Sequence, residues 1–442
     1  MMKTFKGGIH PEDNKQLSAS IPISKMPVTE KIAVSVAQHL GKPAIPLVKN
    51  WEPVSLGQLI AKSDGFVSAN IHSPVSGIVE SIENYPHPVS GYASAIIIKT
   101  DLSKDQEYKY PEATDWRKLT SEEIKRKIAD AGIVGLGGAT FPTIVKLSPP
   151  ADKKIDSIII NGVECEPYLT SDYRLMLEHT DELITGSEII QKIMNVNNIY
   201  IGIESNKKDV YEKIKNKKSV LKPELLKLKY PQGAEKQLID AILNRKVPPG
   251  KLPMDAGVVV INAGTLFAIY EAIVFNKPLI ERIVTVSGRG ITTPKNLLCK
   301  IGTLWSDIIS NCGGLNKNSN IMRLILGGPM MGFAQFTDAV PVIKGCSGIL
   351  VLTDEETVYV EEQPCIRCGK CIRGCPMNLM PSELNRFMDY NDIETLYRLN
   401  ISDCIECGTC AYVCPANKKI IQKIRKYKNK VSEWAKKNVG NQ

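Results

Sequence analysis

The sequence has no long uninterrupted hydrophobic run. Its most apolar stretch, residues 257–275, contains Asn262, Glu271 and several small residues, whereas a membrane-spanning helix needs about 20 predominantly apolar residues. This stretch is instead typical of a buried strand followed by a helix. Residues 1–15 also lack the apolar segment of a secretory signal peptide. We therefore expect a chain that stays in the cytoplasm and whose attachment to a membrane, if it has one, is peripheral.

Outside residues 418–442 the chain has almost no net charge. The formal net charge is +9, but this tail holds nine lysines and arginines and one acid, Glu433. A nearly neutral body argues against nucleic-acid binding, which needs a basic face. The tail has apolar residues at helical spacing, which predicts a basic amphipathic helix. Amphipathicity alone leaves open whether such a helix lies on an anionic membrane, docks on a partner or packs on its own domain.

The chain is long enough for about three domains. Its hydrophobic content of 43% and charged content of 23% are ordinary for a globular protein. We predict a multidomain chain of α/β and α+β units. Residues 1–105 are rich in proline, glycine and short β-type runs and resemble a barrel-sandwich (lipoyl-like) domain.

Residues 118–281 alternate strands with helical segments, which predicts an α/β domain with a largely parallel sheet. Residues 282–345 contain two β-type runs around a short helix and resemble a small β-grasp module of the SLBB type. Residues 350–417 are expected to form a ferredoxin-like domain, and residues 418–442 form the basic helical tail.

Eight of the twelve cysteines form one short pattern that occurs twice. Each copy reads Cys-x2-Cys-x2-Cys-x3-Cys-Pro, over residues 365–376 and 404–415. This is the ligand run of proteins with two [4Fe–4S] clusters, in which the fourth thiolate of each run binds the other cluster. The predicted ligand sets are Cys365, Cys368, Cys371 with Cys414, and Cys404, Cys407, Cys410 with Cys375.

Structural zinc is the main alternative, because CxxC pairs also build zinc sites. Zinc sites seldom need a third cysteine at this spacing and a fourth before a proline, in two copies, so the pattern favours iron–sulfur clusters. Two clusters with exchanged ligands lie close together, which predicts an electron relay. A disulfide framework is typical of small secreted chains, not of a chain of 442 residues.

Two further features accompany the cysteine runs. Arg367, Lys370 and Arg373 interleave the first run, where positive charge either raises the potential of a cluster or forms a docking face. The remaining cysteines have no ligand spacing and are expected to be small, buried and reduced: Cys165, Cys299, Cys312 and Cys346.

A glycine-rich segment, residues 132–143, is the second informative stretch. Glycines let the backbone approach an anion and donate N–H groups to phosphate. The segment lacks the GK[ST] of a Walker loop and is not a GxGxxG after a strand, so by itself it is equally compatible with a connector. Residues 161–167 carry Glu164 and Glu166 after an apolar strand. Strand ends of this kind form the usual ligand edge of an α/β sheet, although a solvated acidic turn is the alternative.

Four segments together resemble the NADH-oxidising flavoprotein subunit of respiratory complex I. Residues 137–143 resemble the GGAGFPT flavin loop of that family, and residues 161–167 its NADExEP segment. Residues 230–238 resemble its YxxGEExAL segment, and residues 262–266 its NNVETL segment. With the start at residues 5–11 and the two cysteine runs, the whole chain resembles the RnfC family, the NADH-site subunits of Rnf ion-translocating ferredoxin:NAD oxidoreductases.

The resemblance implies a translocase subunit with two [4Fe–4S] clusters, FMN and NAD(H) as cofactors. It places the chain peripherally on the cytoplasmic face of the cell membrane. The implied partners are the other membrane and iron–sulfur subunits of the Rnf complex, with ferredoxin as the ultimate electron exchanger and no nucleic acid. Glu164 and Glu166 favour NADH over NADPH, because a 2′-phosphate prefers arginine.

The resemblance also implies residue roles. The glycine loop cradles FMN, Lys146 counters the phosphate charge, and Asn161 bonds the flavin. Glu166 and Glu235 meet NADH. No catalytic acid or base is expected, because hydride transfer needs none. The expected cofactor-binding residues are Gly135, Gly137, Gly138, Ala139, Phe141, Lys146, Asn161, Glu164, Glu166, Glu235, Asn262 and Thr265.

Three positions depart from the flavoprotein pattern. Val163 replaces an aspartate, Ala234 the first glutamate of the GEE motif, and Gly264 a glutamate. These changes support an alternative function, a cluster-bearing adaptor subunit whose nucleotide site is degenerate. A further alternative is a subunit of a soluble NADH-linked hydrogenase or dehydrogenase, which the lipoyl-like N-terminal part and the basic tail disfavour.

Overall fold

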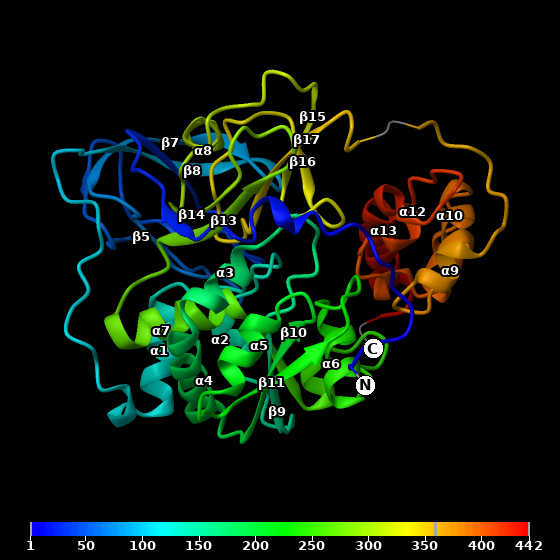
Figure 1. Cartoon of the computed structure of the whole chain (residues 1–442), viewed down its shortest axis with the longest axis horizontal. Coiled ribbons are helices and arrows are strands. Elements are labelled where there is room, and N and C mark those ends of the chain that lie inside the picture. Colours follow the sequence, from blue (N-terminus) through cyan, green and yellow to red (C-terminus); the bar gives the residue numbers. More distant parts are fainter. Residues whose placement is uncertain (1, 358–359, 441–442) are drawn as a thin grey trace.

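The structure is a computed structural model that describes residues 2–357 and 360–440. A large lobe holds three packed domains, and a small lobe holds the two cysteine runs (Figure 1). The N-terminal segment runs from the parallel-sheet domain between the two lobes and into the large lobe. This arrangement confirms the predicted multidomain α/β and α+β fold class.

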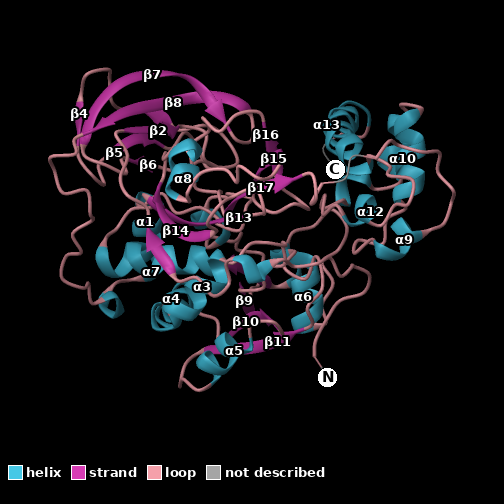
Figure 2. Ribbon diagram, turned by 45° about the horizontal axis from the view of Figure 1, so that its top comes forward, coloured by secondary structure: helices cyan, strands magenta, loops and turns pink. Residues whose placement is uncertain are grey.

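The barrel-sandwich domain consists of two small antiparallel sheets with strand orders β2-β8-β7-β4 and β3-β5-β6. Alternating apolar residues of both sheets, among them Ile32, Ile60, Ile71 and Ile98, bury into one shared core. Figure 2 shows the long β7–β8 hairpin along the outer side of the large lobe. The strands are β2 (Lys31–Ser35), β3 (Ile45–Pro46), β4 (Pro53–Val54), β5 (Leu59–Lys62), β6 (Ile71–His72), β7 (Gly77–His87) and β8 (Gly91–Thr100).

A parallel four-stranded sheet of order β11-β10-β9-β12 forms the second domain, which confirms the predicted parallel sheet. Its strands are β9 (Ser157–Asn161), β10 (Asn198–Glu204), β11 (Leu221–Leu226) and β12 (Val258–Asn262). Its helices are α1 (Ser121–Asp130), α2 (Thr143–Lys146), α3 (Ser171–Glu178), α4 (Thr180–Met194), α5 (Lys208–Lys215), α6 (Glu235–Leu243) and α7 (Ala263–Phe275). Short 3-10 turns add Trp116–Lys118 and Pro253–Ala256.

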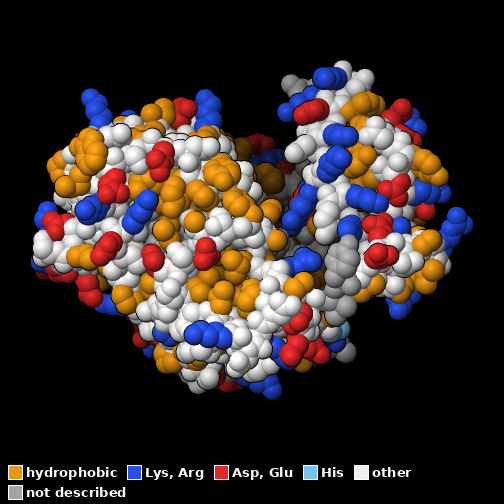
Figure 3. Space-filling view, turned by 90° about the horizontal axis from the view of Figure 1, so that it is seen from above, with side chains coloured by type: hydrophobic (Ala, Val, Ile, Leu, Met, Phe, Trp, Pro, Cys, Tyr) orange, Lys and Arg blue, Asp and Glu red, His pale blue; other side chains and the backbone are white. Residues whose placement is uncertain are grey.

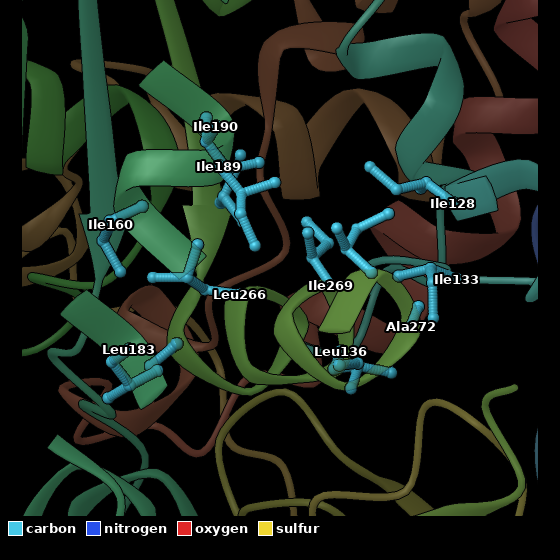
Figure 4. Close-up of a cluster of buried hydrophobic side chains, with 14 of the residues drawn as sticks. Ile128, Ile133, Leu136, Ile160, Leu183, Ile189, Ile190, Leu266, Ile269 and Ala272 are labelled. Atoms are coloured by element: carbon cyan, nitrogen blue, oxygen red, sulfur yellow. The ribbon is translucent and has the colours of Figure 1, made fainter. Parts of the chain in front are cut away.

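The core of this domain determines where the strand ends meet. Ile160 of β9 packs with Ile189 of α4 and with Leu266 and Ile269 of α7 (Figure 4). Helices α4 and α7 therefore stack on one side of the sheet. Strands β9 and β12 are paired in parallel register with Asn161 opposite Asn262, so the carboxyl ends of both strands lie at the same edge.

The third domain is a six-stranded sheet of order β1-β14-β13-β17-β15-β16. Its strands are β1 (Ile23–Lys25), β13 (Glu281–Ser287), β14 (Lys295–Lys300), β15 (Ile321–Leu326), β16 (Phe333–Gln335) and β17 (Gly348–Thr353), and its helix is α8 (Trp305–Asn311). Strand β1 comes from the N-terminal segment and pairs in parallel with β14. The N-terminal segment therefore completes this sheet before the chain enters the barrel-sandwich domain.

The small lobe is helical and includes the basic tail. Its helices are α9 (Lys370–Gly374), α10 (Pro381–Asp389), α11 (Ile393–Arg398), α12 (Thr409–Tyr412) and α13 (Ile420–Asn438), with a 3-10 turn at Ile401–Asp403. The apolar face of α13, including Ile424 and Val431, is buried against Leu384 and Leu396. Of the alternatives for the tail, the structure thus shows an apolar face that packs on its own domain. None of the helices in the described part of the chain is long and apolar enough to cross a membrane.

A fully buried lysine joins three parts of the large lobe. Lys344 Nζ donates to the carbonyl oxygens of Asn70 (2.7 Å) and Gly132 (2.8 Å), and its backbone N–H donates to Gln38 Oε1 (3.0 Å). Burial lowers the pKa of Lys344 to about 7. Lys344 therefore connects the barrel-sandwich domain to the segment that leads into the glycine-rich loop.

We predict that this lysine makes stability depend on pH. An unfolded lysine keeps its proton up to a pKa of 10.5, whereas the folded Lys344 releases it at about 7. The unfolded state binds more protons between these values, so stability rises with pH across this window. Thermal unfolding of Lys344→Met should lack this part of the rise, while the exposed control Lys154→Met should retain it. Identical pH profiles for both variants and the wild type would contradict the prediction.

Candidate functional site

A pocket of about 480 Å³ lies at the carboxyl edge of the parallel sheet, within the usual size range for small-molecule sites. Eleven of the twelve expected cofactor-binding residues line it: Gly135, Gly137, Ala139, Phe141, Lys146, Asn161, Glu164, Glu166, Glu235, Asn262 and Thr265. The twelfth, Gly138, does not line the cavity but turns the loop with a φ of 106°. Such a backbone conformation favours glycine. The fold thus brings segments from four parts of the sequence to one cavity.

The glycine-rich loop is clamped from both sides. Leu136 N–H donates to Thr265 Oγ1 of α7 (2.8 Å), and the buried Arg282 donates from Nη2 to the carbonyl oxygen of Leu136 (2.6 Å). The backbone from Gly137 to Ala139 is exposed. A side chain at Gly137 would place its Cβ 3.4 Å from the Cβ of Asn262. Rigid flanks and a bare backbone form a cradle in which N–H groups approach an anion closely.

The chemistry around the cradle fits the phosphate end of a flavin nucleotide. Thr143 lines the pocket, and its buried hydroxyl has no hydrogen-bond partner among the described residues. Lys146 Nζ donates to Glu235 Oε1 (2.5 Å) and to the carbonyl oxygen of Val260 (3.2 Å). The residues expected to meet phosphate and NADH are therefore ion-paired with each other. A cation, an unpartnered hydroxyl and exposed N–H groups are the donors that a phosphate needs.

Both carboxylates of residues 161–167, which we call the acidic loop, are hydrogen-bonded to protein groups. Glu164 accepts from the backbone N–H groups of Asp172 (2.7 Å) and Tyr173 (3.2 Å), and so caps α3. Glu166 accepts from the backbone N–H groups of Met330 (3.1 Å) and Met331 (2.9 Å). Burial raises the pKa of Glu166 to about 7. The structure shows that these side chains hold the loop in place; their roles toward a nucleotide stay predictions.

Two buried lysines donate hydrogen bonds to the backbone of the acidic loop, and the sequence predicted neither contact. Lys15 Nζ donates to the carbonyl oxygens of Glu164 (2.9 Å), Glu166 (2.9 Å) and Leu169 (2.5 Å). Lys207 Nζ donates to the carbonyl oxygen of Val163 (2.8 Å). Lys15 lies in the 3-10 turn Lys15–Leu17, so the N-terminal segment positions a loop about 150 residues away in the sequence. No short motif marks such a contact.

Asp172 is a further pocket residue that the sequence did not reveal. Asn262 Nδ2 donates to Asp172 Oδ2 (2.6 Å). A Cβ at Gly264 would lie 3.4 Å from Asp172 Oδ1. The carboxylate of Asp172 therefore lies beside Gly264, one of the three positions that depart from the flavoprotein pattern. Burial and the nearby Glu164 raise the pKa of Asp172.

The eight cysteines of the two runs surround two cavities, and each cavity takes one cysteine from the opposite run. In the described residues, no three His, Cys, Asp or Glu side chains converge to hold a single metal ion. Cys365, Cys368, Cys371 and Cys414 instead line one cavity, which we call the outer cavity. Cys404, Cys407, Cys410 and Cys375 line the other, the inner cavity. These are the two ligand sets that the doubled pattern predicts.

The two cavities differ in exposure. Cys365 at the outer cavity is exposed, whereas Cys375, Cys407 and Cys410 at the inner cavity are buried. Burial raises the pKa of Cys404 to about 11, and it also raises the pKa values of Cys375 and Cys410. Such thiols keep their protons at neutral pH unless a metal centre displaces them. The donor set therefore fits a buried inner cluster and a more exposed outer cluster.

The inner cavity adjoins the pocket. Ile405 lines both the pocket and the inner cavity. The Tyr230 hydroxyl lies 2.7 Å from the carbonyl oxygen of Cys407 and 3.2 Å from Glu166 Oε1. Cys165 lines the pocket and packs against Tyr230 and Cys407. The three other cysteines without ligand spacing, Cys299, Cys312 and Cys346, are buried as expected. One layer of side chains thus separates the pocket from the inner cysteines.

Models of four protein families match consecutive parts of the chain. Residues 3–103 match the RnfC barrel sandwich hybrid domain, and residues 128–271 the Nuo51 FMN-binding domain. Residues 283–334 match the SLBB domain, and residues 364–420 the 4Fe-4S dicluster domain. A chain of the NAD+-reducing [NiFe]-hydrogenase in the H2-reduced state is similar with a TM-score of 0.49 and 16% identity, over 72% of this chain and 64% of that one. Fold and site together define an iron–sulfur protein with a flavin-type domain.

Curated relatives are similar over nearly the full chain. A component of the proton-translocating ferredoxin:NAD(+) oxidoreductase complex of Clostridium ljungdahlii is 48% identical over 96% of this chain and 93% of that protein. A component of the Na(+)-translocating ferredoxin:NAD(+) oxidoreductase complex of Acetobacterium woodii is 41% identical over 97% of both chains. A component of the ion-translocating oxidoreductase complex of Rhodobacter capsulatus is 43% identical over 97% and 83%. The chain belongs to the RnfC family.

We predict that Lys15→Met weakens flavin binding. The substitution removes the Nζ donor from three carbonyl oxygens, so the acidic loop loses its support. We expect FMN to bind about tenfold or more weakly in a fluorescence titration, since about 1.4 kcal/mol corresponds to tenfold. Lys6→Met, at an exposed position of the same segment, should bind FMN like the wild type. Equal affinities of Lys15→Met and wild type would contradict the positioning role.

The exchanged ligand sets predict crossed effects of cysteine substitutions. Cys375→Ala should deplete the cluster of the second run, because Cys375 lines the inner cavity. Cys414→Ala should deplete the cluster of the first run, because Cys414 lines the outer cavity. Each variant should retain about half of the iron, and electron paramagnetic resonance of the reduced proteins should show complementary losses. Loss of the cluster from the run that carries the substitution would contradict the exchange.

Proposed function

We propose that this chain is the peripheral electron-transfer subunit of a membrane-bound, ion-translocating ferredoxin:NAD+ oxidoreductase. It passes electrons between NAD(H), FMN and two [4Fe–4S] clusters. The observation that carries the proposal is the contact between the flavin-type pocket and the inner cysteine cavity, which share Ile405 as a wall. Membership of the RnfC family, whose curated members are named as subunits of such complexes, supports the same function.

Flavin, when bound, supplies the exchange between two-electron hydride chemistry and one-electron transfer. The chain positions it: the cradle from Gly137 to Ala139, with Thr143 and Lys146, holds the phosphate end. Asn161 and Asn262, opposite each other at the ends of β9 and β12, orient the rest. Glu235 faces the nucleotide side of the pocket, and the acidic loop forms the wall toward the inner cluster.

The burial of the cysteines supports an order for the relay. The inner cavity adjoins the pocket, and the outer cavity includes the exposed Cys365. With FMN and both clusters bound, the layer with Ile405, Cys165 and Tyr230 would lie between the flavin and the inner cluster, and the outer cluster would be the end of the relay next to solvent. The exchange of Cys375 and Cys414 between the two sets keeps the two centres close together.

We place the chain on the cytoplasmic face of the cell membrane, held there by other subunits of the complex. The apolar face of α13 is buried in its own domain, so only its basic face is available to another protein or a lipid surface. Residues such as Lys426, Lys436 and Lys437 are exposed on it. The membrane and iron–sulfur subunits of the complex are the partners that we propose, and ferredoxin exchanges electrons with the whole assembly.

Anaerobic reconstitution with FMN, iron and sulfide, followed by addition of NADH, tests the function. We expect NADH to bleach the flavin absorbance first and the cluster absorbance next, because the flavin is the only proposed two-electron acceptor. Substitution of both Cys365 and Cys368 by alanine should leave the flavin step intact. A protein that retains no FMN and is not reduced by NADH, although dithionite reduces its clusters, would instead be the cluster-bearing adaptor.

A further inference from the structure

One loop of the third domain touches both the pocket and the small lobe. It connects β15 to β16 and consists of residues 327–332, Gly-Gly-Pro-Met-Met-Gly, and we call it the junction loop. Its Met331 lines the pocket, and its Met330 packs in the small cluster with Tyr230 and Cys407. Figure 3 shows a recess between the large lobe and the small lobe. Contacts at their boundary therefore decide how closely the two lobes approach.

On the pocket side, Glu166 binds the junction loop. Its carboxylate accepts from the backbone N–H groups of Met330 (3.1 Å) and Met331 (2.9 Å). A Cβ at Gly328 would lie 2.1 Å from Glu166 Oε2, so the close approach of this carboxylate requires glycine. Glu166 thus fixes the junction loop to the edge of the pocket.

On the side of the small lobe, Arg425 of α13 binds the same loop. It donates from Nη2 to the carbonyl oxygen of Met331 (2.9 Å), and its guanidinium lies over the ring of Phe333 (4.7 Å). It also pairs with Glu406 (3.3 Å), which belongs to residues 404–409 of the second cysteine run, the inner turn. One side chain of the basic tail therefore connects the junction loop to the turn that carries the inner cysteines.

A backbone contact brings the inner turn directly against the loop. A Cβ at Gly408 would come within 2.8 Å of the carbonyl oxygen of Met330. The first run contains a turn of the same shape, because Arg367 and Gly369 have φ values of 54° and 70°, and Glu406 and Gly408 values of 57° and 78°. Among the described residues, a Cβ at Gly369 would approach only a side chain of its own run. The close contact is therefore a property of the junction and not of the turn.

We propose that the junction loop is the positioning element for electron transfer between the FMN pocket and the inner cysteines, and that Arg425 holds this loop against the small lobe. The inference rests on the proposed function and gives the third domain and the basic tail a role in it. The rate of electron transfer falls steeply with the separation of two redox centres, so a loop bound to both sites controls this step without touching reacting atoms. With FMN and both clusters bound, each transfer removes one electron from the flavin and adds one to the inner cluster, and no bond in the protein forms or breaks.

The variant Gly408→Ala tests the position of the inner turn, because a Cβ fits there only if the turn moves away from Met330. The control is Gly314→Ala in the third domain, where φ is 80° and a Cβ would have no neighbour within 4 Å among the described residues. The proteins, loaded with FMN and both clusters, are mixed with NADH in a stopped-flow instrument. Cluster bleaching should be about tenfold or more slower in Gly408→Ala than in the wild type, since small misplacements have large effects on rates. Flavin bleaching should keep its rate, and the control should match the wild type in both phases.

The variant Arg425→Met tests the loop by a measurement other than activity. It removes the donor to Met331, whereas the control Lys426→Met removes the same charge at the next, exposed position of α13. Hydrogen–deuterium exchange of residues 327–332 in the loaded protein should be about tenfold faster in Arg425→Met than in the wild type. The reason is that losing a hydrogen bond from a charged donor raises the population of the opened loop. Lys426→Met should exchange like the wild type.

Unchanged cluster bleaching in Gly408→Ala with its full iron content would overturn the proposal. So would equal slowing of both phases, or a shift of the inner-cluster potential that accounts for the slower rate. If Gly408→Ala loses iron, the exchange measurement decides alone, and equal exchange in Arg425→Met and the wild type, or equally fast exchange in both tail variants, overturns the proposal. Failure of NADH to reduce the wild type would refute the proposed function, whereas the exchange comparison would still show whether Arg425 holds the junction loop.

Discussion

The contact between the pocket and the inner cysteines is the constraint on which the other features depend. One-electron transfer requires the two redox centres to be close, and here a single layer with Ile405 and Tyr230 separates their sites. The Tyr230 hydroxyl reaches both the acidic loop and the backbone of Cys407. The small lobe is therefore attached to the parallel-sheet domain at the place where electrons cross. Further contacts stabilise the same interface, such as the hydrogen bond that Gln237 Nε2 donates to the carbonyl oxygen of Pro376 (3.1 Å).

Three buried lysines hold loops in place by hydrogen bonds to their backbone. Lys15, Lys207 and Lys344 each donate to backbone carbonyl oxygens in the interior. Loops cannot satisfy their own backbone groups as helices and sheets do, so a long side chain with three donors fixes them efficiently. Desolvation of the ammonium group opposes this arrangement. The benefit is a defined loop geometry: Lys15 and Lys207 place the acidic loop, and Lys344 places the start of the glycine-rich loop.

Patterns that depend on neighbours in the sequence were sufficient to predict much of the fold and which cysteines line each cavity. The alternating elements predict the parallel sheet, and parallel strands bring Asn161 and Asn262 to one edge. Contacts between distant segments escaped prediction. Asp172 enters the pocket from the helix after the acidic loop, and Lys15 arrives from the N-terminal segment. The carboxylate of Glu166 is bonded to the loop at Met330, which is remote in sequence.

The sequence by itself determined the chemistry of the chain: the doubled cysteine run, the glycine-rich loop and the domain order each follow from local spacing and composition. Only the tertiary structure decided which cluster site faces the pocket and which faces solvent. The two cysteine turns have the same backbone conformation, so their spacing cannot distinguish them. Packing does, because Gly408 lies against the third domain while Gly369 remains open. It also decided that the apolar face of α13 is buried, since amphipathic spacing does not specify the surface that covers it.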